Sequence, residues 1–144
     1  MQVSAHAVKR VIGPGEGIPA SHASYSTGIV YGSTLYVSGQ GAFDPATGEL
    51  IDGDFRAQAE RTLENLLMVA AAAGARATDA IRVNVHLANL DDFATFDEVY
   101  RQYFSEPYPT RMTVGSQLLP GMLIEMDGLF AVPDNAGGDG SPAK

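Results

Sequence analysis

The sequence has no cysteine and few basic residues, and both shortages narrow what the protein can do. Without cysteine, the chain forms no disulfide and offers no thiolate as a nucleophile or metal ligand. Nine lysines and arginines stand against 17 aspartates and glutamates, which leaves a formal net charge of −8 at pH 7. Nucleic-acid binding normally relies on clustered Lys and Arg, and no basic run occurs here. The composition therefore argues against a nucleic-acid-binding protein.

Metal-binding and membrane-spanning patterns are also scarce. The three histidines, His6, His22 and His86, are scattered and do not have the spacing of metal ligands. The longest apolar patch, residues 66–73, is far shorter than the roughly 20 residues needed to cross a bilayer. The N-terminus lacks the charged-then-apolar pattern of a signal peptide. We therefore expect a cytoplasmic protein that does not bind a membrane.

The remaining composition fits one packed domain. A chain of 144 residues falls within the size of a single domain, and 45% hydrophobic residues suit a core. Only 18% of residues are charged, a low share for the surface of a monomer, which favours an oligomer. We expect one domain over residues 1–132. The Gly-, Asp- and Pro-rich composition of residues 133–144 predicts a disordered tail.

Hydrophobic periodicity predicts two helices. Residues 54–73 have the spacing of an amphipathic core helix, with Asp54 as its N-cap and Gly74 as its stop. A second helix is expected to run to about residue 104, with Asp91 or Asp92 as its cap. Capping explains this adjacent pair of aspartates, so the pair is not interpreted as a metal site.

Alternating and β-rich runs predict the strands. Residues 81–87 alternate between apolar and polar side chains, which is typical of a half-buried strand. Gly32-Ser33 separates two β-rich runs and predicts a hairpin. The resulting order is β-β-β-α-β-α-β-β. The expected strands are 8–12, 25–31, 34–38, 81–87 and two runs within 110–130.

This order predicts an α+β fold with one mixed sheet and two helices packed on one face. The other face of the sheet would then be partly apolar and open. Burying that face requires a partner, and self-association with cyclic symmetry is the least costly solution.

Arg111 and Glu125 are two charges that their apolar neighbours do not explain. They lie on β-like runs joined by a short loop that contains Pro120-Gly121. We expect facing strands, from which both side chains reach one region of the sheet. Arg grips a carboxylate with a planar fork, and Glu can position or deprotonate a water molecule. From this pair alone, a plain ion pair and a site for a small carboxylate substrate both remain open.

Short motifs around these two residues add a resemblance. Pro109-Thr110-Arg111, Leu119-Pro120 and Ile124-Glu125-Met126 follow one another as they do in the RidA/YjgF family of enamine/imine deaminases. The resemblance covers roughly residues 8–132, which identifies the expected domain as RidA-like. Further matching motifs are Tyr36-Val37-Ser38-Gly39-Gln40, Asp44-Pro45-x-Thr47-Gly48, Gln58-Ala59, Asn65-Leu66, Ala72-Ala73-Gly74 and Leu90-x-Asp92-Phe93.

The resemblance implies a chorismate-mutase-like homotrimer with three clefts between subunits. It implies hydrolysis of short 2-enamino or 2-imino acids, such as 2-aminoacrylate and 2-aminocrotonate, to 2-oxo acids and ammonia. This activity protects pyridoxal-phosphate enzymes from such intermediates. The resemblance implies no cofactor and no metal.

The resemblance also implies roles for individual residues. Arg111 would bind the substrate carboxylate, and Glu125 would hold the attacking water. Tyr25 matches a tyrosine that lines the family's cleft. Ser38 and Gly39 match the strand end that lies against the substrate.

Two further cleft positions depart from the family pattern. Thr113 falls where bacterial members often carry Cys, and its hydroxyl could still donate a hydrogen bond. Asp97 falls where many members carry Asn, and an ionised carboxylate facing an anionic substrate is unfavourable. These departures indicate a divergent subfamily.

Three alternatives to the general deaminase therefore remain. The first is a deaminase dedicated to one pathway and a larger imine. The second is a non-catalytic trimer that binds small carboxylates and regulates a partner. The third is a ribonuclease, which the net charge of −8 argues against.

Overall fold

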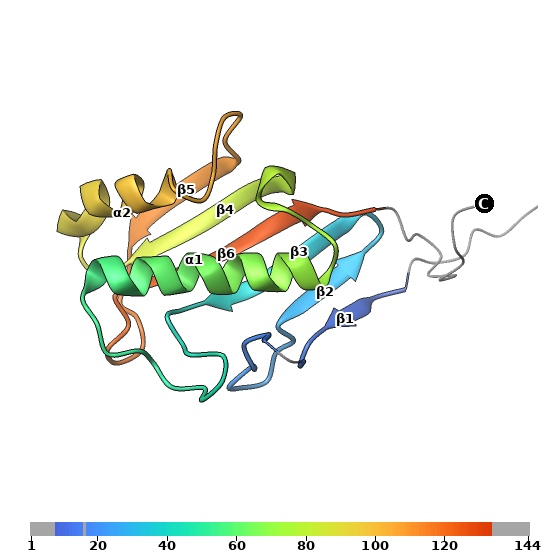
Figure 1. The fold of residues 1–144 in the computed structure, drawn as a ribbon, viewed down its shortest axis with the longest axis horizontal. Helices are drawn as coiled ribbons and strands as arrows, with labels where there is room; N and C mark the ends of the chain where they lie inside the picture. Colours follow the sequence, from blue (N-terminus) through green and yellow to red (C-terminus); the bar gives the residue numbers. More distant parts are fainter. Residues whose placement is uncertain (1–7, 16, 134–144) are drawn as a thin grey trace, which may run out of the picture.

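Six strands form one mixed β-sheet, and two helices cover one of its faces (Figure 1). The computed structural model describes residues 8–15 and 17–133. The predicted α+β class is confirmed, whereas the predicted tail, apart from Pro133, lies outside the described residues. The strands are β1 (Arg10–Ile12), β2 (Gly28–Tyr31), β3 (Thr34–Gln40), β4 (Ala80–Leu87), β5 (Thr110–Gly115) and β6 (Ile124–Ala131), and the helices are α1 (Phe55–Ala72) and α2 (Phe93–Tyr100).

The strands are ordered β1-β2-β3-β6-β4-β5 across the sheet. Only β4 and β5 pair in parallel, and α2 lies in the crossover that a parallel pair requires. The expectation that the strands of Arg111 and Glu125 face each other is wrong. β4 lies between them, because the chain crosses from the edge strand β5 to insert β6 beside β3.

Local sequence signals set the turns and the ends of α1. Tyr31 pairs with Thr34, so Gly32 and Ser33 form the predicted two-residue hairpin loop. Gly32 has a φ of 64° and no described non-glycine residue has a positive φ, which fits a type II′ turn. Asp54 caps α1 as predicted, because its side chain accepts a hydrogen bond from the Ala57 backbone N–H at 2.9 Å.

The second helix is shorter than predicted. A 3₁₀ turn, η2 (Leu90–Asp92), precedes α2, which ends at Tyr100. Because the chain enters through this turn, the capping side chain belongs to Asn89, whose Oδ1 accepts from the Asp91 N–H at 2.8 Å. Asp92 stands at the N-cap of α2 without a capping hydrogen bond, so the predicted aspartate cap is wrong.

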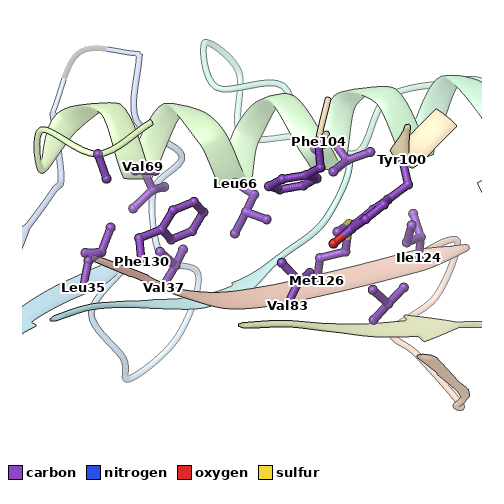
Figure 2. Packing of buried hydrophobic residues seen from close by; sticks show 14 of the residues in the cluster. Leu35, Val37, Leu66, Val69, Val83, Tyr100, Phe104, Ile124, Met126 and Phe130 are labelled. Carbon is purple, nitrogen blue, oxygen red and sulfur yellow. The ribbon is translucent and has the colours of Figure 1, made fainter. Parts of the chain in front are cut away.

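The core lies between α1, α2 and the sheet (Figure 2). Leu66 of α1, Phe130 and Met126 of β6, and Val83 of β4 are fully buried. Burying each such side chain stabilises the fold by about 1.5–3 kcal/mol. The sheet is therefore a firm support for the side chains on its two faces.

The face of the sheet without helices carries both polar and apolar side chains. Asn84 of β4 donates to Asp127 of β6 at 2.8 Å and accepts from Arg82 at 3.1 Å. Tyr36 and Met112 lie on the same face and are about half exposed. No helix in the described ranges is long and apolar enough to span a membrane.

Candidate functional site

Arg111 points from β5 toward α2. It pairs in register with Val83, whose side chain is buried beneath the helices. Its Nη1 donates to Oδ1 of Asp97 on α2 at 2.8 Å. No other hydrogen bond joins the Arg111 side chain to the described residues, so Nε and Nη2 have no hydrogen-bond partner among them.

Aromatic rings of α2 surround the Arg111 guanidinium. Its central carbon lies 4.7 Å from the ring centroid of Tyr100, 5.2 Å from that of Phe96 and 5.7 Å from that of Phe93. Cation–π attraction favours this arrangement. The rings also reduce contact with water, so the charge is less screened than it would be on an open surface.

A cavity of about 450 Å³ opens beside Arg111. Asp97 lies at its wall and accepts a second hydrogen bond, from Arg101 Nη1 to Oδ2 at 2.8 Å. One carboxylate therefore bridges two guanidiniums. We name this space the arginine cavity, and it is lined by Asp97, Tyr100, Arg101, Tyr108, Pro109 and Arg111.

The Tyr100 hydroxyl is a buried group of the arginine cavity without a hydrogen-bond partner among the described residues. Burial raises the pKa of Tyr100 to about 12, and the nearby positive charge of Arg111 opposes this shift. At neutral pH, the phenol is a protonated donor, and a buried unpaired donor is costly unless a ligand satisfies it.

Glu125 lies on the other face of the sheet. It pairs in register with His86 of β4, whose neighbours Val85 and Leu87 are buried under the helices. Its carboxylate covers Gly39 of β3, where any side-chain Cβ would collide with it. A second cavity of about 360 Å³ opens there, which we name the glutamate cavity; its lining includes Tyr25, Thr27, Gly39, Phe43, Leu119 and Glu125.

The structure corrects the expectation that Arg111 and Glu125 reach one region. Arg111 shares its face of the sheet with Val83, whereas Glu125 shares its face with His86. Residues 83 and 86 point to opposite sides of the same strand because side chains alternate along it. Within one chain, Arg111 and Glu125 do not form the plain ion pair either, since the carboxylate paired with Arg111 is Asp97.

The other predicted residues divide between the two faces. Asp97 contacts Arg111, and Thr113 shares its face, with a buried hydroxyl that has no partner among the described residues. Tyr25 and Gly39 line the glutamate cavity with Glu125.

Ser38 is placed differently from the cavity residues. Its hydroxyl donates to the Ser26 carbonyl at 2.5 Å, and it is not among the residues that line the glutamate cavity. Its predicted contact with the substrate stays a prediction.

Sequence reasoning missed three residues of the arginine cavity. Arg101 carries a readable signal, because Asp97 and Arg101 are four residues apart on a helix and can pair. Helical spacing places Tyr100 on the apolar face of its helix, and nothing in that spacing indicates an unpaired hydroxyl. Tyr108 lies in the loop before β5, where the sequence gives no periodicity to interpret.

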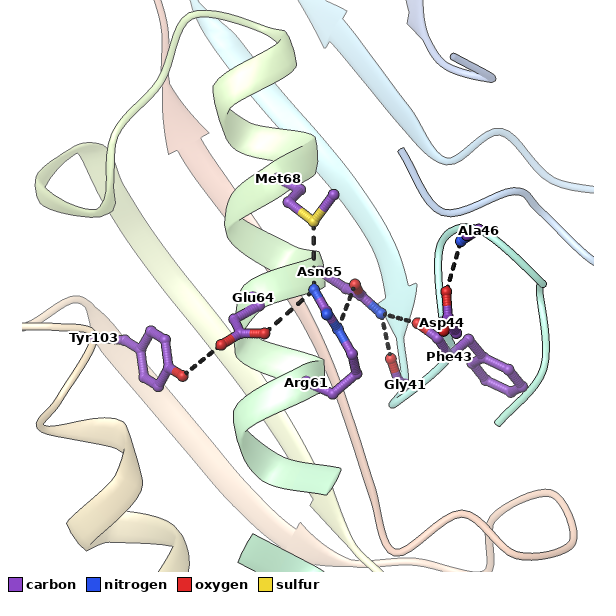
Figure 3. Close-up of polar contacts among 9 residues, drawn as sticks. All are labelled: Gly41, Phe43, Asp44, Ala46, Arg61, Glu64, Asn65, Met68 and Tyr103. Carbon is purple, nitrogen blue, oxygen red and sulfur yellow. Dashed lines mark hydrogen bonds and ion pairs between the residues drawn. The ribbon is translucent and has the colours of Figure 1, made fainter. Parts of the chain in front are cut away.

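Two polar side chains of α1 fasten the segments around the glutamate cavity. Gln58 donates to the Gly121 carbonyl and accepts from the Leu123 N–H, both at 3.0 Å. Asn65 donates to the carbonyls of Gly41 and Phe43 at 2.9 and 2.7 Å, and its own Oδ1 is held by Arg61 (Figure 3). The segment that precedes Glu125 in the chain and the segment that follows β3 are thereby tied to one helix.

Potential metal ligands are not clustered in the described part of the chain. No group of three or more His, Asp or Glu side chains there is arranged to hold a metal ion. The two cavities offer two guanidiniums, two carboxylates, phenol hydroxyls and the imidazole of His22.

Comparison with known proteins places this geometry in a family. The sequence family described as Endoribonuclease L-PSP matches residues 16–132. A RutC family protein of Pyrococcus abyssi is 40% identical over 115 residues, which cover 79% of this chain and 91% of that protein. The human 2-iminobutanoate/2-iminopropanoate deaminase is 34% identical over 121 residues, which cover 83% and 88%. The chain belongs to the RidA/YjgF family.

A solved RidA/YjgF structure shares the fold. RidA from an Antarctic Psychrobacter superposes with a TM-score of 0.80 at 39% identity, covering 85% of this chain and all of that chain. The residues of both cavities lie within the matched range 16–132. The RidA/YjgF resemblance expected from the motifs is confirmed.

Proposed function

We propose that this protein hydrolyses short 2-enamino and 2-imino acids to 2-oxo acids and ammonia. The observation that carries the proposal is the Arg111 guanidinium, which lines a cavity, is walled by aromatic rings and has no hydrogen-bond partner at Nε and Nη2 among the described residues. A planar carboxylate fits the edge formed by these two nitrogens with two parallel hydrogen bonds. The name of the human relative, an iminobutanoate deaminase, supports the same substrate class.

Glu125 is proposed to hold the attacking water. Its carboxylate is fixed over Gly39 and lines a cavity that is large enough for a small substrate. The water adds to C2 of the protonated imine while Glu125 accepts one of its protons, which gives a carbinolamine. Glu125 returns that proton to the nitrogen, which leaves as ammonia, and the C2 hydroxyl loses its proton to Glu125 to give the 2-oxo acid. Neither a cofactor nor a metal takes part in this scheme.

Arg111 and Glu125 lie on opposite faces of the sheet, so they can act on one substrate only if the site is formed by two subunits. Within one chain, Arg111 and Glu125 point away from each other. We propose a homotrimer in which the arginine cavity of one subunit meets the glutamate cavity of the next. Exposed apolar side chains on the open face, such as Tyr36 and Met112, favour burial by a second copy.

The proposal also names the physiological substrates and the cellular role. 2-Aminoacrylate and 2-aminocrotonate are the proposed substrates, and protection of pyridoxal-phosphate enzymes in the cytoplasm is the proposed role. Asp97 and Thr113 lie beside Arg111, so they are the residues proposed to adjust which imine is preferred. A deaminase dedicated to a larger imine has the same machinery and differs only in the volume of the completed cleft.

The test uses a lyase that releases 2-aminoacrylate from serine. The wild-type protein should accelerate release of the 2-oxo acid, and Arg111→Ala should abolish the acceleration. Arg56→Ala is the control, because Arg56 forms an exposed ion pair with Glu98 away from both cavities. An Arg111→Ala protein as active as the control contradicts the mechanism.

A non-catalytic carboxylate-binding protein is the second candidate. It is favoured by one observation, the Asp97–Arg111 ion pair, which occupies part of the guanidinium in the ligand-free chain. Calorimetric titration with 2-oxobutanoate, together with turnover assays on several imines, separates the two. Binding without turnover, and binding unchanged in Glu125→Gln, supports the second candidate.

A further inference from the structure

In the arginine cavity, Asp97 is paired with two arginines, Arg111 and Arg101. Binding of a carboxylate by Arg111 does not by itself require this arrangement. The two oxygens of Asp97 each accept from a different arginine at 2.8 Å, Oδ1 from Arg111 and Oδ2 from Arg101. All three side chains line the same cavity. Arg111 is the least exposed of them, at 22%, and Arg101 is the most exposed, at 55%.

Within one subunit, the charges that line this cavity sum to one positive unit, and this sum leaves out Glu125, which the proposed trimer brings from the next subunit. Two guanidiniums and one carboxylate give 2 − 1 = +1, and the other lining residues are the two tyrosines and Pro109. One ligand carboxylate brings the sum to zero. A second ligand carboxylate leaves a net negative charge next to Asp97, which is unfavourable in a partly desolvated space.

Arg101 is the residue that keeps the sum positive. Without it, Asp97 would neutralise Arg111, and an incoming carboxylate would meet an existing carboxylate at a site with no net charge. Asp97 in turn occupies only Nη1 of Arg111, which orients the guanidinium and leaves Nε and Nη2 without a hydrogen-bond partner among the described residues. The pair therefore orients Arg111 and sets the charge available to the ligand.

We propose that the Asp97–Arg101 pair makes the site selective for 2-imino acids with one carboxylate and an uncharged side chain, against those with two carboxylates. Arg101 is a positioning and charge-compensating residue that does not itself contact the substrate. This inference rests on the carboxylate-binding role proposed for Arg111.

A series of four proteins tests the charge sum. Asp97→Asn raises the sum to +2, Arg101→Gln lowers it to 0, and the double variant returns it to +1. The probes are 2-oxobutanoate, with one carboxylate, and 2-oxoglutarate, with two. Affinities are measured by calorimetry at low salt and again near 0.5 M NaCl, because salt screens partly exposed charges.

The affinity for 2-oxobutanoate should rise and fall with the sum of charges in the cavity. Arg101→Gln should weaken it on the order of tenfold, and the double variant should recover to within about threefold of wild type. Asp97→Asn should improve 2-oxoglutarate binding on the order of tenfold, which narrows the preference for one carboxylate. All of these shifts should shrink at high salt.

Two control variants change the protein charge equally but outside the cavity. Glu98→Gln lies next to Asp97 in the chain, and Arg56→Gln removes the cation that pairs with Glu98 at 2.6 Å. Neither should change the ratio of the two affinities. Equal effects in these controls would mean that the overall charge of the protein, and not the cavity, sets the preference.

Other outcomes also overturn the inference. If the double variant does not recover the affinity for 2-oxobutanoate, Arg101 contacts the ligand and the compensating role is wrong. Failure of wild type to bind either acid removes the proposed function together with this inference. Binding that follows the charge series in a protein without imine turnover removes only the deaminase, because every readout here is an equilibrium affinity.

Discussion

The carboxylate of Glu125 lies directly over the α-carbon of Gly39 on the neighbouring strand β3. The pairing of β3 with β6 is irregular between Val37 and Gln40, so the contact falls at a break in the ladder. Glycine is needed there for close approach, because a Cβ would occupy the space of the carboxylate. The placement of Glu125 thus depends on a residue without a side chain.

Gly39→Ala should therefore impair activity more than stability. The added methyl displaces the end of a flexible side chain, so we expect a loss of unfolding free energy of at most about 1 kcal/mol. Because the carboxylate moves, imine turnover should fall at least about tenfold. Thermal melting and the coupled lyase assay measure the two effects. Unchanged turnover in Gly39→Ala would show that the position of Glu125 over Gly39 does not matter for activity.

Mixing two inactive variants should restore activity if the site is composite. Trimers assembled from Arg111→Ala and Glu125→Gln subunits regain an intact pair wherever the two variants adjoin in the right order, in about one site in four. The variants are unfolded and refolded together, and activity is compared with each variant refolded alone. Persistent inactivity of correctly sized mixed trimers would place both residues in the same subunit's site or in none.

Tyr100→Phe removes the unpaired hydroxyl of the arginine cavity. We expect the ligand-free protein to be as stable as wild type or more stable by up to about 1 kcal/mol, because no hydrogen bond to the described residues is lost. The affinity for 2-oxobutanoate should fall roughly fivefold, since we expect the hydroxyl to donate to the bound acid. A large drop in melting temperature would instead reveal a structural partner for this group.

Stability should also decline at alkaline pH. The pKa of Tyr100 is raised from its ordinary value of 10.0 to about 12, so folding favours the protonated phenol. The stabilisation is complete below pH 10 and is lost as the pH rises from 10 through 12. Tyr103, which donates to Glu64, has its pKa raised in the same way by burial. Tyr100→Phe and Tyr103→Phe should each flatten the decline in denaturant melts, and an unchanged slope in both would contradict this assignment.

Asn65→Ala should be among the most destabilising single changes. The fully buried amide donates to two carbonyls, and both would be left unsatisfied. We expect a loss of about 2–4 kcal/mol of unfolding free energy. Glu64→Ala, one residue away in an exposed ion pair with Arg61, is the control and should lose at most about 1 kcal/mol. Similar losses in both variants would mean that the amide contacts are not important for stability.

Local features of this fold are predictable from the sequence, and long-range ones are not. Asp54 caps α1 and Gly32-Ser33 forms a hairpin loop because both signals act within a few residues. Alternation correctly groups Arg111 with Thr113, but it does not say which face of one strand meets which face of another. That relation depends on β4 lying between β5 and β6. Likewise, helical spacing buries Tyr100 but cannot reveal that its hydroxyl lacks a partner.

The two amides of α1 have a consequence for how mutations in this protein would be interpreted. Gln58 and Asn65 tie down the segments on both sides of Glu125, although the Gln58 and Asn65 side chains point into the interior of the fold. A random-mutagenesis screen scored by turnover would therefore recover helix positions that never touch a ligand. Substitutions at these positions would lower the rate without abolishing substrate binding. They would cluster along the one face of α1 that holds the segments near Glu125.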